Sequence, residues 1–157
     1  MSEPVNQLPG YFRVFQGADG SFVDIHETHG KLESRQNLPI ALFLAARGER
    51  VRLLPVNAVA GVKNPDATRN DISWEFKKPS AISRNAIDKA LRDGSRQADR
   101  ILLWLPDGFL LQLLEDGIYD RTQRTPKIVA VAVLLGQALY TFSRQKIVSN
   151  LFRNALQ

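Results

Sequence analysis

The segment ISWEFK at residues 72–77 constrains the fold most strongly, because its apolar and polar side chains alternate one by one. Successive side chains of a β-strand point to opposite faces, so this period of two predicts a strand with one packed face and one charged face. The Asn-Asp pair before it favours a tight turn. We therefore predict a β-hairpin within residues 63–78, with its indole and phenyl rings inward and Glu75 and Lys77 on the other face.

The rest of the chain alternates between strand and helix patterns, which predicts a mixed α/β (α+β) layered fold. Asn37 is the expected N-cap of a helix that has Pro39 in its first turn and ends at Gly48. Residues 26–39 fit either a helix or a loop. The predicted strands outside the hairpin are 11–15, 21–25, 50–54, 100–105, 127–135 and 138–144, and the predicted helices are 39–48, 83–93, 109–121 and 147–156.

Length and composition are those of one soluble domain. The chain has 157 residues, of which 44% are hydrophobic, enough for a substantial core. We expect residues 1–10 to be a flexible lead-in and residues 11–157 to form a single domain. The longest apolar run, 128–135, is far shorter than the roughly 20 residues of a membrane helix, and the chain opens without a secretory signal pattern. No stable membrane association is therefore expected.

The cysteine content and the net charge limit which metal sites, cross-links and binding partners the chain can have. The chain has no cysteine, which excludes a disulfide framework and a thiolate zinc site. Its formal net charge is +5. A basic balance of this size fits nucleic acid or an acidic protein partner, and it also fits a mildly basic protein with neither. The sequence predicts no oligomeric state.

Asp66, Glu75 and Lys77 form the group best suited to chemistry. In the predicted hairpin the two carboxylates lie on neighbouring strands, where side chains on one face are roughly 5–8 Å apart. They would repel unless a cation lay between them, and hard divalent ions bind carboxylate oxygens. Lys77 points to the side of Glu75 and could orient a water or stabilise charge on a phosphate. The alternative is a surface hairpin with a cross-strand salt bridge.

Histidines and arginines give weaker signals. HETHG at residues 26–30 is not the zinc-protease motif, because His26 and His29 are three positions apart rather than four. They are either proton carriers at a cleft edge or two exposed histidines. Five cations around the second predicted helix either follow a phosphate backbone or form a solvated helix face: Arg84, Lys89, Arg92, Arg96 and Arg100. Neither a glycine-rich phosphate loop nor a GxSxG motif occurs in the sequence.

Pro65-Asp66, a short gap and Glu75-Phe76-Lys77 resemble the PD-(D/E)XK signature of restriction-endonuclease-like nucleases. The resemblance implies a central mixed sheet flanked by helices, with a core of helix, three strands, helix and strand. The elements predicted between residues 39 and 105 have this order, and the end hairpins are additions. The longer string KNPDA…WEFKKPS…AIDKAL…QADRILL is similar to the C-terminal toxin domains of contact-dependent growth inhibition (CdiA) and related polymorphic bacterial toxins, over roughly residues 26–144.

By position, this resemblance implies that Asp66 and Glu75 are metal ligands and that Lys77 is the catalytic lysine. The implied cofactor is Mg²⁺ or Mn²⁺, with Zn²⁺ less favoured. A carboxylate from the first core helix usually completes such sites.

Glu33 is the candidate for that helix acid and Glu27 is its substitute. The sequence departs from the family pattern here, because a helix starting near Pro39 would leave Glu33 ahead of it. Substrate contacts are expected from Gln97, Lys78, Arg96 and His29. For Gln97, a hydrogen bond at a helix end is the alternative.

The resemblance implies a metal-dependent endonuclease toxin that cleaves RNA, and tRNA in particular, by phosphodiester hydrolysis. Such a toxin acts in the bacterial cytoplasm after delivery as part of a secreted or surface protein, and a cognate immunity protein binds it. One alternative is a metal-independent ribonuclease of the barnase, EndoU, colicin or RelE kind, in which His26 or His29 would matter. Another is a non-catalytic nucleic-acid-binding or interaction domain on a nuclease-like scaffold.

Overall fold

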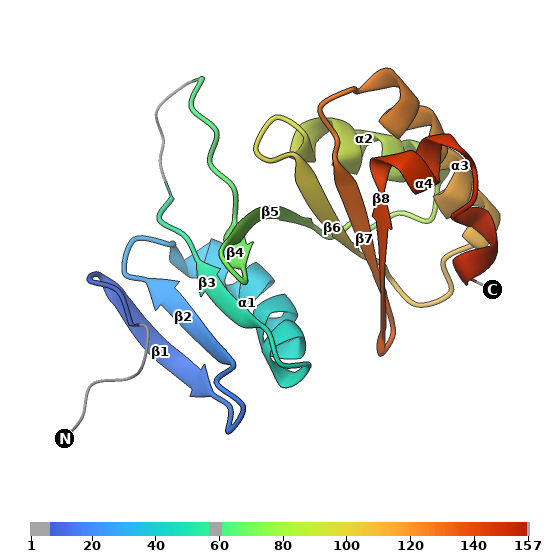
Figure 1. Cartoon of the computed structure of the whole chain (residues 1–157). Coiled ribbons are helices and arrows are strands. Elements are labelled where there is room, and N and C mark those ends of the chain that lie inside the picture. Colours follow the sequence, from blue (N-terminus) through green and yellow to red (C-terminus); the bar gives the residue numbers. More distant parts are fainter. Residues whose placement is uncertain (1–6, 57–60, 157) are drawn as a thin grey trace. The chain divides into compact units, whose positions relative to one another are not determined.

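The structure is a computed structural model that describes residues 7–56 and 61–156. In the described residues it is a mixed α+β fold of four α-helices and eight strands, with the strands paired in sequence order from β1 to β8 (Figure 1). This confirms the predicted fold class. The chain divides after Trp74 into two compact units, the N-terminal unit (Met1–Trp74) and the C-terminal unit (Glu75–Gln157). Strand β5, Ile72–Lys77, continues from one unit into the other.

The N-terminal unit is a mixed sheet with one helix packed on it. The predicted first hairpin is confirmed, and its second strand pairs in parallel with the third. The third strand then pairs antiparallel with β4, and β4 with the start of β5. Helix α1 packs on β2 and β3. The elements are β1 (Tyr11–Gln16), β2 (Phe22–His26), α1 (Lys31–Ala46), β3 (Arg50–Leu53) and β4 (Ala67–Arg69).

The hairpin predicted within residues 63–78 is also confirmed, and its turn has the expected chemistry. Asn70 and Asp71 have φ values of 47° and 70°, in the left-handed region that asparagine and aspartate tolerate better than most residues. Two successive positive φ values are those of the turn that best matches strand twist in a two-residue hairpin. The Asn70 side chain accepts a hydrogen bond of 2.9 Å from the Arg50 amide, which fastens the turn to β3.

The C-terminal unit is built on an apolar core. The second half of β5 pairs in parallel with β6, β6 in parallel with β7, and β7 antiparallel with β8. The middle of β6 is buried, as its nearly continuous apolar sequence predicts. The elements are α2 (Arg84–Gly94), β6 (Arg100–Trp104), α3 (Leu111–Arg124), β7 (Ala130–Leu135), β8 (Ala138–Ser143), α4 (Arg144–Val148) and a short 3-10 helix, η1 (Arg153–Leu156).

Two predicted helices differ from the structure. Helix α1 begins at Lys31, so Pro39 lies inside it rather than in its first turn. Proline removes one backbone hydrogen bond, but burial of the apolar face of α1 outweighs that local cost. The single closing helix predicted for 147–156 is wrong: α4 ends at Val148, Asn150 turns the chain with a φ of 66°, and η1 follows.

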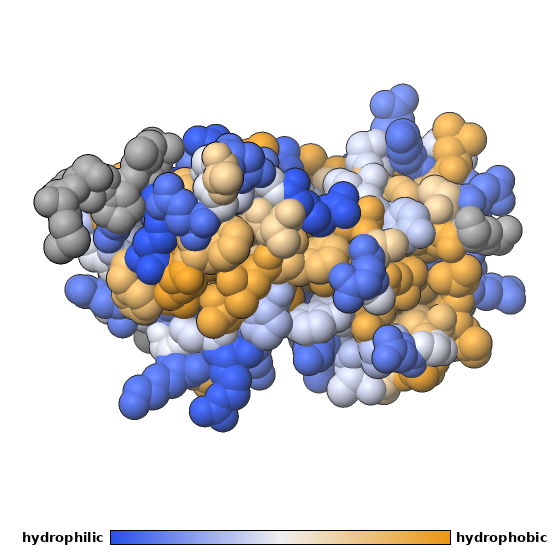
Figure 2. Space-filling view, turned by 90° about the horizontal axis from the view of Figure 1, so that it is seen from below, coloured by the Kyte–Doolittle hydropathy of each residue, from blue (hydrophilic) through white to orange (hydrophobic). Residues whose placement is uncertain are grey.

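Some large apolar side chains stay exposed, among them Phe12, Leu32 and Leu110. Figure 2 shows one face of the molecule, on which hydrophobic residues lie among hydrophilic ones. In the described ranges no helix has both the length and the apolar character needed to cross a bilayer. Part of the predicted lead-in, residues 1–6, lies outside the described residues. The single-domain interpretation of residues 11–157 stays a prediction.

Candidate functional site

Glu75 and Lys77 are in contact on β5. The Lys77 Nζ lies 3.2 Å from the Glu75 Oε2, as residues two apart on one strand allow. Glu75 is only 4% exposed, whereas about a third of the Lys77 side chain is open to solvent, at 32%. A buried carboxylate is costly unless it is paired, so Lys77 both neutralises Glu75 and carries positive charge to the surface.

The burial of Glu75 corrects one expectation: on the polar face of β5, Ser73 is exposed and Lys77 is partly exposed, but Glu75 between them is buried. Helix α2 ends against this part of the strand. A β-carbon placed on Gly94 would lie 3.1 Å from Ile101 Cγ1 and 3.6 Å from Glu75 Cγ. Because Gly94 has no side chain, the end of α2 approaches β5 and β6 closely enough to cover Glu75.

Asp66 belongs to the N-terminal unit, where it is half-buried immediately before β4. Its carbonyl accepts a hydrogen bond of 2.9 Å from the Leu54 amide, which fixes the backbone at this point. Ala67 and Trp74 are register partners in the hairpin, and in the sequence Asp66 directly precedes Ala67 and Glu75 directly follows Trp74. A metal ion shared by the two carboxylates stays a prediction.

Glu33 lies in the first turn of α1 and is half-buried. The expectation that it precedes the helix is therefore wrong, because α1 starts eight residues earlier than the sequence indicated. A carboxylate is thus present in the first turn of α1, and its role in a nuclease site stays a prediction. The substitute candidate, Glu27, is exposed and lines a cavity of about 440 Å³ in the N-terminal unit together with His26.

His29 is buried, at 1% exposure, so the expectation of two exposed histidines is wrong for this one. One ring nitrogen is hydrogen-bonded to the Leu54 carbonyl and the other lies 3.2 Å from the Asn37 amide nitrogen. Asn37 is correspondingly a buried residue of α1 rather than its N-cap. In this conformation His29 ties α1 to the end of β3 and offers almost no surface to a substrate. His26 is half-buried.

The predicted substrate contacts of the C-terminal unit lie around α2. Arg96 is exposed, and its guanidinium lies 3.6 Å from the Asp93 carboxylate. Gln97 is half-buried just after α2, and its backbone N–H donates a hydrogen bond of 2.9 Å to the Gly94 carbonyl. The Lys78 ammonium lies 4.3 Å from the centre of the Trp104 ring, a cation–π arrangement. Their roles in substrate binding stay predictions.

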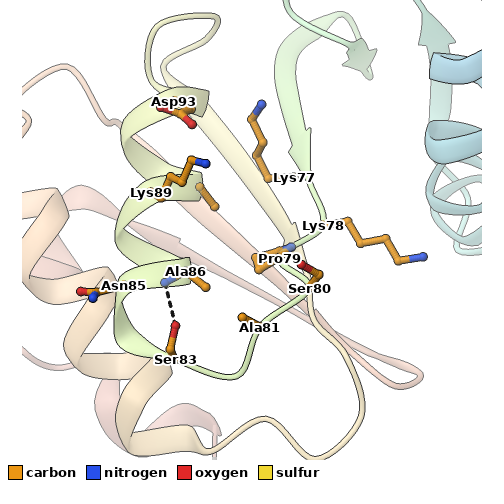
Figure 3. A pocket seen from close by; sticks show the side chains of 11 residues that line it. Lys77, Lys78, Pro79, Ser80, Ala81, Ser83, Asn85, Ala86, Lys89 and Asp93 are labelled. Carbon is orange, nitrogen blue, oxygen red and sulfur yellow. Dashed lines mark hydrogen bonds between the residues drawn. The ribbon is translucent and has the colours of Figure 1, made fainter.

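A cavity of about 450 Å³ opens beside Lys77, between the end of β5 and α2. Figure 3 shows Lys77 and Lys89 on its two sides, whereas Lys78 points away from α2. Sequence reasoning did not identify this cavity. The available signal was a pair of alanines one helical turn apart, Ala86 and Ala90, which leave room where longer side chains would fill it.

Several cations of α2 and α3 are engaged in ion pairs, which favours the solvated structural face over a free phosphate track. The Asp88 carboxylate accepts two hydrogen bonds from Arg121, at 2.8 and 3.0 Å, and lies 3.1 Å from Arg124. These bonds hold the pKa of Asp88 below its ordinary value. Arg84 of α2 also forms an ion pair with Asp120 of α3. Together the pairs tie α2 to α3.

Within residues 7–56 and 61–156, no group of three or more histidine, aspartate or glutamate side chains is arranged to hold a metal ion. The ligands predicted from the sequence, Asp66 and Glu75, are only two carboxylates and so fall below a group of three.

Residues 63–117 match the family described as Contact-dependent growth inhibition CdiA C-terminal domain. A solved structure, "CdiA-CT/CdiI toxin and immunity complex from Burkholderia pseudomallei", is similar with a TM-score of 0.53 and 21% sequence identity, over 73% of this chain and 89% of that chain. This likeness concerns the fold. Comparison with curated protein sequences gave no match. The resemblance to CdiA-type C-terminal domains indicated by the sequence is therefore confirmed, and the PD-(D/E)XK assignment stays a prediction.

Proposed function

We propose, from the match of residues 63–117 to the CdiA C-terminal domain family, that this chain is a toxin domain of contact-dependent growth inhibition. We propose further that it is an endonuclease that hydrolyses RNA, with tRNA as the favoured substrate. The matched segment contains Asp66, Glu75 and Lys77. The similar solved structure is described as a toxin with its immunity protein, which supports the toxin assignment.

The observation that carries the nuclease proposal is the contact between Glu75 and Lys77. A glutamate and a lysine two positions apart are the second half of the nuclease signature, and here their charged groups lie 3.2 Å apart. Glu75 is buried and Lys77 reaches solvent beside a cavity. This arrangement suits a positioned acid with a cation facing a phosphate.

The side chains fit a hard divalent ion better than a zinc site. Mg²⁺ is commonly held by one or two carboxylates together with waters and substrate phosphate oxygens, which is the set that Asp66 and Glu75 would provide. Zinc sites instead use three or four protein ligands rich in cysteine and histidine. We therefore propose Mg²⁺ or Mn²⁺. When bound, such an ion supplies positive charge and lowers the pKa of a water ligand.

The residues around this site have separate roles in the proposal. Glu75 and Asp66 bind the ion, and the buried position of Glu75 fixes its carboxylate. Lys77 holds a proton on Nζ and places positive charge next to the phosphate, where negative charge grows during hydrolysis. Glu33 is proposed as the carboxylate from the first helix that completes the catalytic group.

A cognate immunity protein is the proposed protein partner. The net charge of +5 favours an acidic surface on that partner, as it favours the phosphates of RNA. The proposed site of action is the cytoplasm of a target bacterium, after delivery as part of a surface or secreted toxin.

Gel analysis of total tRNA and duplex DNA tests this proposal. Wild-type chain with Mg²⁺ should cut tRNA into discrete fragments, and a chelator should stop the reaction. Glu75→Gln should lose at least about 100-fold in rate, the scale expected when one electrostatic group is removed from an active site. Lys146→Ala, which removes an exposed lysine of α4, is the charge-matched control for Lys77→Ala and should cut like wild type.

Activity that survives chelation would contradict the metal and favour the metal-independent ribonuclease alternative. Binding of tRNA without cleavage by wild type and Glu75→Gln alike would contradict the catalytic proposal itself.

A further inference from the structure

The cavity beside Lys77 lies within the C-terminal unit, and its lining residues come from the end of β5, the loop that follows it and one side of α2. Helix α2 has one stripe of residues in the core, including Ile87 and Leu91, and another stripe that faces the cavity. The cavity stripe carries small and polar side chains at helical spacing. Across from α2, the wall is formed by the end of β5 and the following loop. The lining residues used in this argument are Lys77, Pro79, Ala81, Ala86, Lys89 and Ala90.

The lining combines apolar residues, which we call the apolar floor, with charged ones: three lysines, and Asp93, whose carboxylate lies 3.6 Å from the guanidinium of Arg96. Pro79, Ala81, Ala86 and Ala90 present short hydrocarbon surfaces. Lys89 is exposed and forms no ion pair with any described residue, so its ammonium is available to an anion. Figure 3 shows Lys89 extending from α2 toward β5. Ser83 is already engaged, because its Oγ accepts the Ala86 amide at 3.0 Å as the cap of α2.

A ligand that uses both features has a flat apolar face and an adjoining anion. A nucleotide has this composition: its base would contact the apolar lining and its phosphate would lie at the Lys89 ammonium. The volume of about 450 Å³ is within the roughly 300–1,000 Å³ typical of small-ligand sites. Sequence-specific recognition of RNA commonly uses single-stranded segments, whose unstacked bases are splayed out and contacted individually by the protein.

We infer that the cavity between β5 and α2 binds one nucleotide of the RNA substrate next to the cleaved phosphate, with Lys89 as its phosphate ligand and Ala86 and Ala90 as the contact surface for the base. Lys77 belongs both to the Glu75–Lys77 pair and to the cavity wall, which places the cavity beside the proposed catalytic site. The inference that the bound nucleotide belongs to an RNA substrate therefore rests on the proposed ribonuclease function. Neither Lys89 nor the two alanines take part in the proposed chemistry.

Binding of the four ribonucleoside 5′-monophosphates and of inorganic phosphate to the full chain tests the inference without catalysis. At least one monophosphate should bind about tenfold more tightly than inorganic phosphate, because only the nucleotide contacts the floor. Ala90→Leu fills the cavity and should weaken that binding at least about tenfold. Lys89→Ala should weaken it by about tenfold through loss of a charge-assisted contact. Ala155→Leu, the same substitution at an exposed position of η1, is the matched control and should change nothing.

A second arm measures cleavage of a short RNA. Ala90→Leu and Lys89→Ala should raise KM at least about fivefold and leave kcat within about twofold. Unchanged KM in both variants, with cleavage intact, would overturn the nucleotide site while leaving the proposed function standing. Loss of monophosphate binding in Ala90→Leu, in a chain that cuts no RNA, would support the site while the proposed function fails. Failure of all four monophosphates to bind wild type would also overturn the inference.

Discussion

The two units of the chain bury their side chains in different ways. In the N-terminal unit, charged and polar groups enter the interior: Asp24 is 0% exposed and is held by two hydrogen bonds from Arg13, at 2.8 and 3.0 Å. Arg13 and Arg52 also lie over the Phe22 ring. In the C-terminal unit the interior is a continuous apolar cluster drawn from α2, β6, α3, β7 and the C-terminal helices, and two buried carboxylates, Glu75 and Glu115, are 4% and 5% exposed.

This difference indicates where a precise site can be built. A buried ion pair has to offset the desolvation of both charges, so it adds little net stability while penalising any rearrangement. An apolar core built on tight packing holds its surface elements in place. The Glu75–Lys77 pair and the neighbouring cavity lie on the apolar unit, which suits a site that must keep its geometry.

The largest effect is expected from Asp24→Asn. The substitution breaks the buried ion pair of Asp24 with Arg13, whose side chain is only 7% exposed, and breaking a buried pair by removing one charge costs about 3 kcal/mol or more. Amide hydrogen exchange should show the free energy of opening falling throughout the N-terminal unit. The control is Asp71→Asn, which breaks the 2.9 Å contact of Arg52 with an aspartate that is 62% exposed. That exposed pair should cost about 0.5 kcal/mol or less. Equal effects of the two variants would contradict the contrast between the units.

A smaller loss is expected when the packing of the C-terminal unit is crowded. A β-carbon on Gly117 of α3 would lie 2.8 Å from both Cβ and Cγ2 of Ile87 on α2, so Gly117→Ala must separate the helices. We expect a net loss of about 1–2 kcal/mol in the free energy of unfolding, after the better helix propensity of alanine is included. An Ile87→Ala background removes the Cγ2 contact but keeps the Cβ contact, so the same change should cost less there without becoming free. Additive effects in this double-mutant cycle would show that the two helices are not tightly packed here.

The smallest effect is expected from Glu115, a buried glutamate of the C-terminal unit. Glu115 of α3 is 5% exposed, and its Oε2 has no hydrogen-bond partner among the described residues. Burial raises its pKa, Arg153 opposes this shift and Asp116 adds to it. A carboxyl whose folded pKa is raised favours the folded state below its unfolded pKa and loses that contribution as pH rises through the folded pKa. Glu115→Gln should therefore stabilise the chain by about 1 kcal/mol at pH 7.

The pH dependence distinguishes this explanation from a general packing effect. The advantage of Glu115→Gln over wild type should shrink as pH falls and disappear below about 4.3, the ordinary pKa of glutamate. Denaturant unfolding at several pH values measures it. An advantage that is constant with pH would show that ionisation of Glu115 is not its cause.

Much of the fold could be predicted from short-range patterns. The alternation at residues 72–77 and the Asn-Asp turn predicted the second hairpin, and the helical spacing of apolar residues within 83–93 predicted α2. The start of α1 was missed because Pro39 is a strong local signal, whereas the stabilisation that extends the helix back to Lys31 comes from packing. The burial of Glu75 was missed for a related reason. The end of α2 at Gly94 packs against Glu75 through a tertiary contact, and a lone glycine in the sequence does not reveal that contact.

The candidate site was predictable in part. The spacing of Glu75 and Lys77 on one strand gave their contact directly. The cavity was not found, because its floor consists of alanines and a proline that resemble ordinary helix and loop residues. Such a site depends on which stripe of α2 faces the core, and this is decided by the packing of α2 against α3.

The central claim is that Glu75 and Lys77 act together on a phosphate of RNA. The most direct test is a kinetic double-mutant cycle of Glu75→Gln, Lys77→Ala and the double variant, measured as single-turnover cleavage of tRNA with Mg²⁺, with folding verified by hydrogen exchange. The account predicts that each single change lowers the rate at least about 100-fold and that the double variant is scarcely slower than either, because groups that act as a unit are strongly non-additive. Rates that stay within about threefold of wild type in either single variant, or losses that simply multiply in the double variant, would contradict it.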